Sequence, residues 1–202
     1  MSNPVRFFLM STLILLAVPC LAGAVVEPKT ETEYPDAVTV VAGGQSHELV
    51  ATGVGLREKT FMKVDVYTIV SYVAAGTELS GDKGIALLEF DGVKRLQMDL
   101  RRGFSREKLV NAFKDVIEEN YEDTSAFQTD MDAFFGYFAE DAQENDNLVF
   151  TYVPGEGLTT VLNGEVKGVI TNFEFVKALW TVWFGEDPAN GGLKKNLLAQ
   201  LG

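Results

Sequence analysis

Arg57 and two tyrosines downstream of it, Tyr67 and Tyr72, are the residues of this chain best suited to hold an anion. A guanidinium group presents a planar fork of N–H donors that matches a carboxylate or a phenolate-type oxygen. The tyrosines lie in a run rich in β-branched residues, so their hydroxyl groups could donate from a mostly apolar wall. Gly53 and Gly55 precede Arg57 and would let the backbone bend and approach a ligand closely. This set of residues is typical of an anion-binding site.

A simpler interpretation of Arg57 stays open. Most arginines are solvated or paired with a surface acid, and Arg57 could be an ordinary residue at the edge of a strand. Whether Arg57 and Tyr67 converge is also open, because a turn expected at Glu58-Lys59-Thr60 would reset which face of the sheet the following residues occupy. The types and spacing of these residues predict a site without proving one.

Several other kinds of site are excluded by the residue inventory. His47 is the only histidine, so the chain has no histidine triad and no histidine-based metal cluster. Gly53-Val54-Gly55 lacks the third glycine and the following helix of a dinucleotide-binding motif. We therefore expect no metal and no cofactor.

The chain is acidic, with a formal net charge of -12. Such a protein is repelled by nucleic acids and by anionic lipid surfaces, so no nucleic-acid partner is expected. The acids cluster in predicted helix ends and loops, where a solvated acidic face is a simpler interpretation than an active site built on paired carboxylates. These clusters are Glu118-Glu119, Glu122-Asp123, Glu140-Asp141 and Glu144-Asn145-Asp146.

Residues 1–24 have the pattern of an export signal. Arg6 supplies the positive start, an apolar stretch follows, and a small-x-small cleavage pattern ends at Ala24. The apolar stretch is shorter than the roughly 20 residues that span a bilayer, so no transmembrane helix should remain after cleavage. Cys20 raises the alternative of a lipoprotein, but Pro19 stands where a small residue normally precedes the lipid-accepting cysteine. The expected location is the periplasm or the outside of the cell.

The mature chain would contain no cysteine, so packing alone must stabilise it. Residues 25–36 contain two prolines and no periodicity and are predicted to form a flexible leader. Residues 37–202 fit one domain by length.

Alternating and β-branched runs predict strands in both halves of the chain, and turn signals separate them. Helical periodicity marks one helix capped by Ser105, an aromatic one containing Met131, one from about Asn172 to Trp183 capped by Thr171, and one at the C-terminal end. The aromatic stripe is interpreted as core packing. This order predicts an α+β fold, with a largely antiparallel sheet covered by helices. The predicted strands are 38–41, 46–50, a strand containing Leu56, 61–73, 85–90, 95–100, 148–153, 158–162 and 166–170.

From about residue 38 to residue 201 the chain resembles the chalcone isomerase family in three blocks. The first is Gly-x-Gly-x-Arg with its tyrosine-bearing strand at 53–73, and the second is Phe104-Ser105-Arg106 followed by Asn111. The third covers 179–198 and includes Trp183-Phe184-Gly185-Glu186-Asp187-Pro188. The resemblance implies an open-faced β-sandwich with a ligand cleft between a large antiparallel sheet and a helical layer.

The resemblance also implies roles for single residues. Arg57 matches the arginine that steadies enolate charge in the plant isomerases, and Asn111 matches their asparagine. Phe104, Tyr67 and Val182 fall where those enzymes carry a tyrosine, a threonine and a threonine or serine. Three polar groups have therefore changed or gone, which disfavours chalcone isomerisation.

Three functions follow as hypotheses. The first is a non-catalytic, exported binder of a fatty acid or a similar apolar carboxylate, a use also known in this family, with Arg57, Tyr67, Phe104, Asn111 and Val182 around the ligand. The second is an intramolecular lyase of the chalcone isomerase type that acts on another enone. The third is a structural or interaction domain whose cleft is closed.

Overall fold

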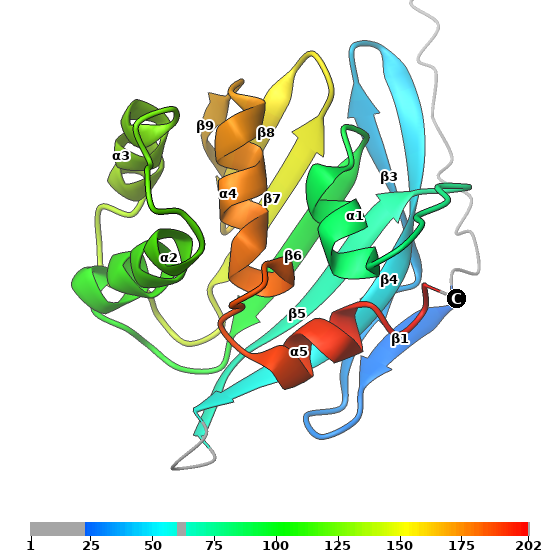
Figure 1. The fold of residues 1–202 in the computed structure, drawn as a ribbon. Coiled ribbons are helices and arrows are strands. Elements are labelled where there is room, and N and C mark those ends of the chain that lie inside the picture. The colour runs from blue at the N-terminus through cyan, green and yellow to red at the C-terminus, as the bar shows by residue number, and fades with distance from the viewer. Residues whose placement is uncertain (1–22, 60–63, 202) are drawn as a thin grey trace, which may run out of the picture.

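The computed structural model describes residues 23–59 and 64–201, and in them seven strands form one antiparallel sheet (Figure 1). Each strand pairs with the next along the chain, so the sheet is a simple meander with β3 and β9 at its edges. Period-two alternation favours the strands, and the turn residues between them favour pairing of each strand with the next. The strands are β3 (Ala37–Ala42), β4 (Gln45–Lys59), β5 (Val64–Ala74), β6 (Lys94–Leu100), β7 (Asn147–Val153), β8 (Gly157–Leu162) and β9 (Glu165–Ile170).

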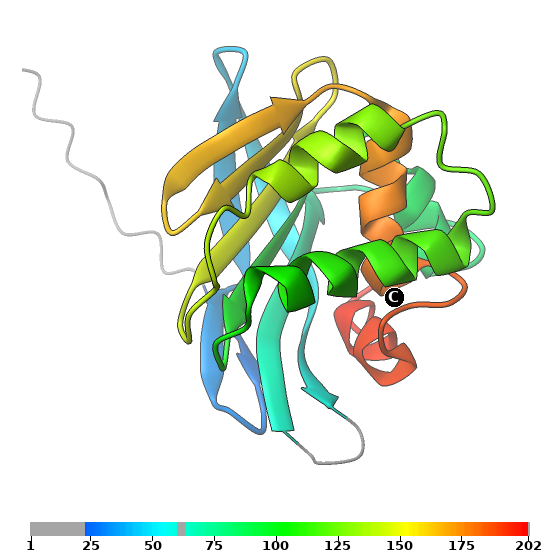
Figure 2. The same cartoon turned by 90° about the vertical axis from the view of Figure 1, so that its left-hand side faces the viewer.

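Five helices lie against one face of this sheet, as the turned view in Figure 2 shows. The fold is therefore α+β, an open-faced sandwich with its main core between the sheet and the helices, and the predicted class is confirmed. The helices are α1 (Lys83–Glu89), α2 (Arg106–Asn120), α3 (Gln128–Gly136), α4 (Phe173–Phe184) and α5 (Gly191–Leu197).

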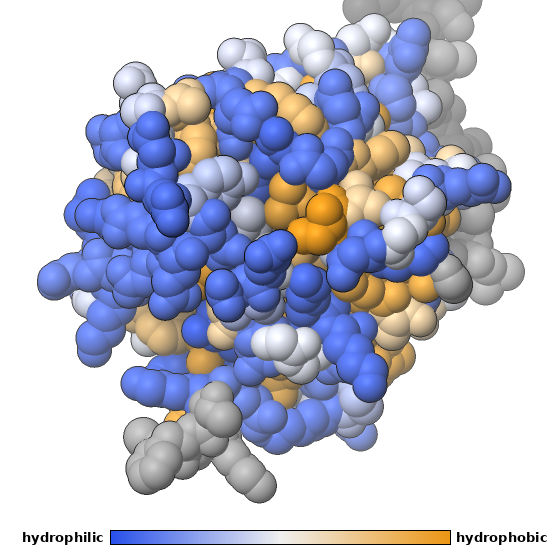
Figure 3. Space-filling view, viewed as in Figure 1, coloured by the Kyte–Doolittle hydropathy of each residue, from blue (hydrophilic) through white to orange (hydrophobic). Residues whose placement is uncertain are grey.

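The helix α4 runs through the middle of the helical layer and is buried along most of its length. Trp180 and Trp183 are among its fully enclosed side chains. The predicted aromatic stripe packs here too: the Phe134 ring of α3 lies 5.6 Å from the ring of Phe113 on α2. Outside this core, Figure 3 shows the helix-bearing face as mostly hydrophilic. The residues of the acidic clusters are exposed, with the exception of half-buried Asp146.

The predicted flexible leader is wrong. Residues 24–35 form a hairpin of β1 (Ala24–Glu27) and β2 (Thr32–Pro35), which packs on the face of the sheet opposite the helices. Val25 and Tyr34 are buried there, and the Tyr34 hydroxyl lies 2.8 Å from Thr68 Oγ1. The prolines and charges of this segment are not typical of strands, so the pattern did not predict the hairpin. Its stability comes from this second, small core rather than from local sequence.

The predicted strand at 85–90 is also wrong, because this segment is the helix α1. A short apolar run fits a buried strand and a buried helix equally well by pattern alone. Asp82 decides the outcome at the start, where its carboxylate accepts from the Ile85 amide over 3.0 Å. At the other end, Lys94 Nζ donates to the carbonyl oxygens of Leu87 and Leu88. Because Lys94 belongs to the strand β6, its contacts with α1 cannot be predicted from the local sequence of the helix.

Two smaller predictions are corrected. The segment around Leu56 is not a separate strand, because β4 continues from Gln45 through Glu58 and Lys59 without the expected turn. The predicted strand 61–73 corresponds to β5, and its first residues lie outside the described residues. At the start of α4 the cap is Asn172 rather than Thr171, since the Asn172 side chain accepts from the Glu174 amide. The other predicted helices and strands are confirmed.

Candidate functional site

Arg57 and Tyr67 lie directly opposite each other on the neighbouring antiparallel strands β4 and β5. The register shifts immediately beyond this pair, where Glu58 faces Asp65 and Val66 is the extra residue of a bulge. Bulges bend a strand and redirect its side chains. The two residues therefore meet on the helix-facing side of the sheet, which settles the question that the spacing left open.

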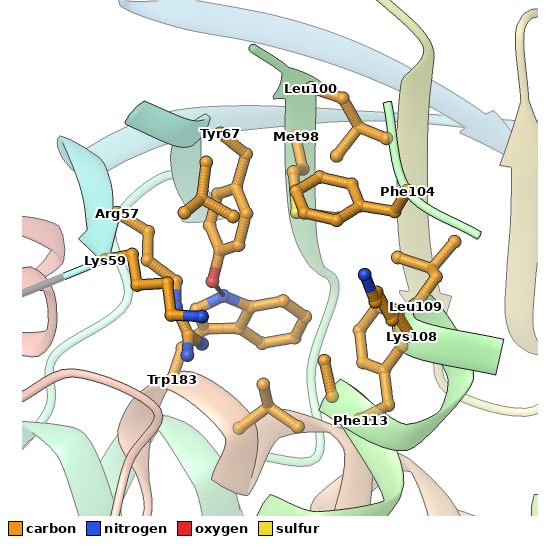
Figure 4. Close-up of a pocket in the computed structure, with 13 residues that line it drawn as sticks. Arg57, Lys59, Tyr67, Met98, Leu100, Phe104, Lys108, Leu109, Phe113 and Trp183 are labelled. Atoms are coloured by element: carbon orange, nitrogen blue, oxygen red, sulfur yellow. Dashed lines mark hydrogen bonds between the residues drawn. The ribbon is translucent and has the colours of Figure 1, made fainter. Parts of the chain in front are cut away.

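Both side chains line a cavity of about 390 Å³ between the sheet and the helices α2 and α4 (Figure 4). This volume is within the range of small-molecule sites in proteins. Strands β4, β5 and β6 supply one wall, and the helices supply the other. The cavity is lined by Arg57, Lys59, Val66, Tyr67, Met98, Leu100, Phe104, Lys108, Leu109, Ala112, Phe113, Val182 and Trp183.

The Tyr67 hydroxyl is held in place by Trp183. The indole Nε1 donates to the Tyr67 oxygen over 3.0 Å, and both side chains are buried, with exposed fractions of 7% and 1%. Because this oxygen accepts from the indole, its own O–H remains available as a donor toward the cavity. Burial raises the pKa of Tyr67, and the nearby positive charge of Arg57 acts in the opposite direction without reversing the shift. At neutral pH Tyr67 is therefore a neutral donor.

Three positive side chains surround the cavity: Arg57 and Lys59 from β4, and Lys108 from α2 on the far side (Figure 4). We call these three residues the cationic rim. No carboxylate is among the described residues that line the cavity, although the chain carries a net charge of -12. The rim therefore concentrates positive charge at the entrance of an apolar space.

The acids nearest to the rim along the strands face the other way. Glu58 lies between Arg57 and Lys59 in β4, and alternate residues of a strand point to opposite faces. On that opposite face, Lys29 of the β1–β2 hairpin pairs with both Glu58, over 2.7 Å, and Asp65. The hairpin thus holds these two carboxylates away from the cavity.

The role first assigned to the glycines changes. Gly53 and Gly55 lie inside β4, not in a turn, and they allow α5 to approach the strand. A Cβ at Gly53 would lie 2.1 Å from the Asn196 carbonyl oxygen, and one at Gly55 would lie 2.6 Å from a methyl group of Leu193. These glycines serve helix packing and do not approach the cavity.

Four of the five predicted ligand-binding residues line the cavity, namely Arg57, Tyr67, Phe104 and Val182. Asn111 does not: it is exposed on α2 and lines an adjoining hollow instead of the apolar cavity. Helix residues two positions apart do not share a face, and Leu109 and Phe113 on either side of Asn111 point inward. The prediction for Asn111, made from the resemblance, fails for this reason.

Other lining residues were missed as site residues, above all Lys59, Lys108 and Trp183. Lys59 could have been predicted from its spacing to Arg57, because residues two apart on a strand share a face of the sheet. Lys108 lies one residue before the buried Leu109 and reaches the cavity only because of how α2 is oriented.

No helix within residues 23–59 or 64–201 combines the length and hydropathy that crossing a bilayer requires. The same residues contain no group of three or more histidine, cysteine or carboxylate side chains that could hold a metal ion.

Two comparisons with known proteins, one with solved structures and one with family models, agree on the fold. A third, with curated protein sequences, finds no match. Among solved structures, a fatty-acid binding protein of Arabidopsis thaliana superposes with a TM-score of 0.70 at 19% identity, over 89% of this chain and 97% of that one. A family model described as chalcone isomerase-like matches residues 29–199, which include every element of the sheet and all five helices. The chain belongs to the chalcone isomerase-like family.

Proposed function

We propose that this protein is an exported, non-catalytic binder of a fatty acid or a similar apolar carboxylate. The head group binds at Arg57 and Tyr67, and the tail occupies the apolar part of the cavity. One observation carries this proposal: a guanidinium and a fixed phenol stand opposite each other at one side of a cavity whose remaining walls are mostly apolar.

The chemistry of the lining residues fits this ligand. A bond from the charged Arg57 guanidinium to the head group contributes about 1.5–3 kcal/mol, and the neutral Tyr67 hydroxyl can supply a second, weaker one. Each methylene of the tail that leaves water contributes about 0.8 kcal/mol. The walls near Tyr67 consist of Met98, Phe104 and Trp183, which offer apolar surface to a chain. An anionic head and an apolar tail are both accommodated.

Binding is favoured over conversion by the kinds of group at the cavity. Among its described lining residues, neither a carboxylate nor a histidine is present to act as a general base. Phe104 and Val182 carry no hydroxyl group, and the raised pKa of Tyr67 keeps its phenol protonated. The Arabidopsis protein of similar fold is a fatty-acid binding protein, which supports the same choice. The open cavity also disfavours an interaction domain with a closed cleft.

The test is a titration of a fluorescent fatty acid into the wild type and three variants. Arg57→Met and Tyr67→Phe should weaken binding, while Arg95→Met should not. Arg95 is a matched control because it is half-buried like Arg57 but lies on the opposite face of the sheet, in β6. Equal affinity of all four proteins would contradict the proposal. Flavanone formation from a chalcone, well above the spontaneous rate and abolished by Arg57→Met, would favour an isomerase instead.

Export is part of the proposal and has its own test. Cleavage after Ala24 would remove the first residue of β1 and leave buried Val25 as the new N-terminus. Expression of the full chain in a bacterium, followed by fractionation and intact-mass measurement, should give a form beginning at Val25 outside the cytoplasm. A form that begins at Cys20 with added acyl mass would support the lipoprotein alternative.

A further inference from the structure

The cationic rim carries more positive charge than a carboxylate can neutralise. Arg57, Lys59 and Lys108 contribute three charges, and a carboxylate supplies one negative charge in return. None of the three forms an ion pair with a carboxylate of the described residues. Like charges held close together repel one another, so an unpaired cluster of this kind favours a ligand of higher charge.

The fold maintains this excess of charge. Lys29 engages Glu58 and Asp65 on the far side of the sheet, so these acids do not compensate Arg57 and Lys59. Lys108 reaches the rim from α2, across the cavity from the two strand residues (Figure 4). Two independent elements, a strand and a helix, thus supply cations to the two sides of one cavity in a strongly acidic protein.

A second hollow adjoins the first and provides space for a head group larger than a carboxylate. It measures about 490 Å³ and shares Arg57, Lys108 and Ala112 with the apolar cavity. Farther along α2 it contains Asp115 and Glu119. At a rise of about 1.5 Å per residue, these acids lie roughly 10 and 16 Å along the helix axis from Lys108. They would repel an anion from the far end of the hollow and so favour its position at the rim.

The size of the apolar cavity favours a tail of one chain. At about 390 Å³ the cavity lies near the lower end of the range of small-molecule sites in proteins. One chain of moderate length suits such a space better than two.

We propose that the ligand is a single-chain amphiphile whose head is a phosphate monoester, with the chain in the apolar cavity and the phosphate among Arg57, Lys59 and Lys108. A phosphate monoester carries about 1.5 to 2 negative charges at pH 7 and three acceptor oxygens, which match three cations better than a carboxylate does. The inference rests on the proposed function, because it uses the same cavity, and it makes the class of ligand more specific.

The test compares three probes with the same twelve-carbon chain, below their micelle-forming concentrations, by calorimetry at pH 8. These are dodecyl phosphate, dodecanoate and methyl dodecyl phosphate, whose phosphate is a diester with a single negative charge. Dodecyl phosphate should bind about tenfold more tightly than the other two, since one additional charge near partly exposed cations has an effect of this order. The double variant Lys59→Met/Lys108→Met should remove this preference, because dodecyl phosphate should lose more affinity than dodecanoate, whose head group is held mainly by Arg57.

A second double variant serves as the control. Lys114→Met/Lys195→Met also removes two exposed lysines, but neither lines the cavity. It should retain the preference for dodecyl phosphate. If both double variants lose that preference equally, the effect comes from net charge and the inference fails. If dodecanoate binds through Arg57 but dodecyl phosphate binds no more tightly, the inference fails and the proposed function stands. If none of the probes binds, both fail.

Discussion

Two regions of this protein place a cation against aromatic side chains, and they treat it in opposite ways. Lys94, in β6, is completely buried, and its Nζ donates to the carbonyl oxygens of Leu87 and Leu88 over 3.1 and 2.9 Å. The rings of Trp180, Phe173 and Tyr152 lie 5.2, 5.3 and 5.8 Å away. We call this group the lysine cage. Arg57 is only half-buried and faces open space beside Tyr67 and Trp183.

The comparison separates a basic side chain that the fold uses from a cation that is available to a ligand. In the lysine cage the protein itself supplies acceptors and aromatic faces, so Lys94 joins α1 to the sheet and leaves nothing for a ligand. At the cavity the hydrogen-bonding capacity of Arg57 is not used by a carboxylate of the described residues. Removal of Lys94 should therefore affect stability, whereas removal of Arg57 should affect binding.

The largest effect is expected for Arg57→Met. This variant should weaken fatty-acid binding by about 2–5 kcal/mol, because it removes the charged partner of a desolvated head group. Its free energy of unfolding should change by less than about 1 kcal/mol, since Arg57 forms no ion pair with a carboxylate of the described residues. Fluorescence titration and urea unfolding measure the two quantities. A variant that loses stability but keeps its affinity for the fatty acid would reverse the roles of the two regions.

Lys94→Ala should show the opposite behaviour. It removes a buried side chain from between three rings and leaves two carbonyl groups without a donor, so the protein should lose about 2–4 kcal/mol of stability. Affinity for the fatty acid should stay within about twofold, because Lys94 does not line the cavity. Urea unfolding against Lys195→Ala, an exposed lysine, gives the reference. A stability equal to that of this control would show that the lysine cage contributes little.

The pH dependence of stability sharpens the comparison further. Burial lowers the pKa of Lys94 to about 7, while Glu89 and Asp91 oppose the shift and Lys177 adds to it. In the unfolded chain this amine titrates near 10.4, so between about pH 7 and 10 the unfolded state binds a proton that the folded state lacks. This group alone should make stability rise with pH, by up to about 1.4 kcal/mol per pH unit, and have no effect below pH 7.

Lys94→Met provides the control for that slope, because it keeps the length of the side chain and removes the titrating amine. The difference in unfolding free energy between wild type and Lys94→Met should grow in favour of the wild type as the pH increases from 7 to 9. The tyrosines with raised pKa values remain in both proteins and cancel in the difference. A difference that is constant with pH would mean that Lys94 keeps its charge in the folded state.

The smallest effect is expected for Tyr67→Phe. Loss of one neutral donor should weaken fatty-acid binding by about 0.5–1.5 kcal/mol, well below the effect of Arg57→Met. The Trp183 indole would also lose its acceptor, so tryptophan emission should shift in the absence of ligand. Titration together with emission spectra checks both outcomes. An effect on affinity as large as that of Arg57→Met would make the phenol, not the guanidinium, the main anchor.

Much of the fold was predictable because it is encoded in local patterns. Period-two alternation marked most of the strands, and apolar spacing marked α2 to α5, since both depend only on neighbouring residues. Ser105 was recognised as a cap for the same reason, and it accepts from the Lys108 amide. Residue type singled out Arg57 and two tyrosines, and the resemblance to the chalcone isomerase family selected Tyr67 as the partner of Arg57.

The remaining features depended on partners that are distant in the sequence. The β1–β2 hairpin forms on a core supplied by β4 and β5, and α1 is held by Lys94 from β6. The sequence by itself determined the alternation of strands and helices and the presence of an arginine and tyrosines in one segment. Only the tertiary structure decided that Arg57 faces Tyr67, that Lys108 joins them and that Asn111 does not. Strand register, helix rotation and the pairing of charges are set by long-range packing, which local patterns do not encode.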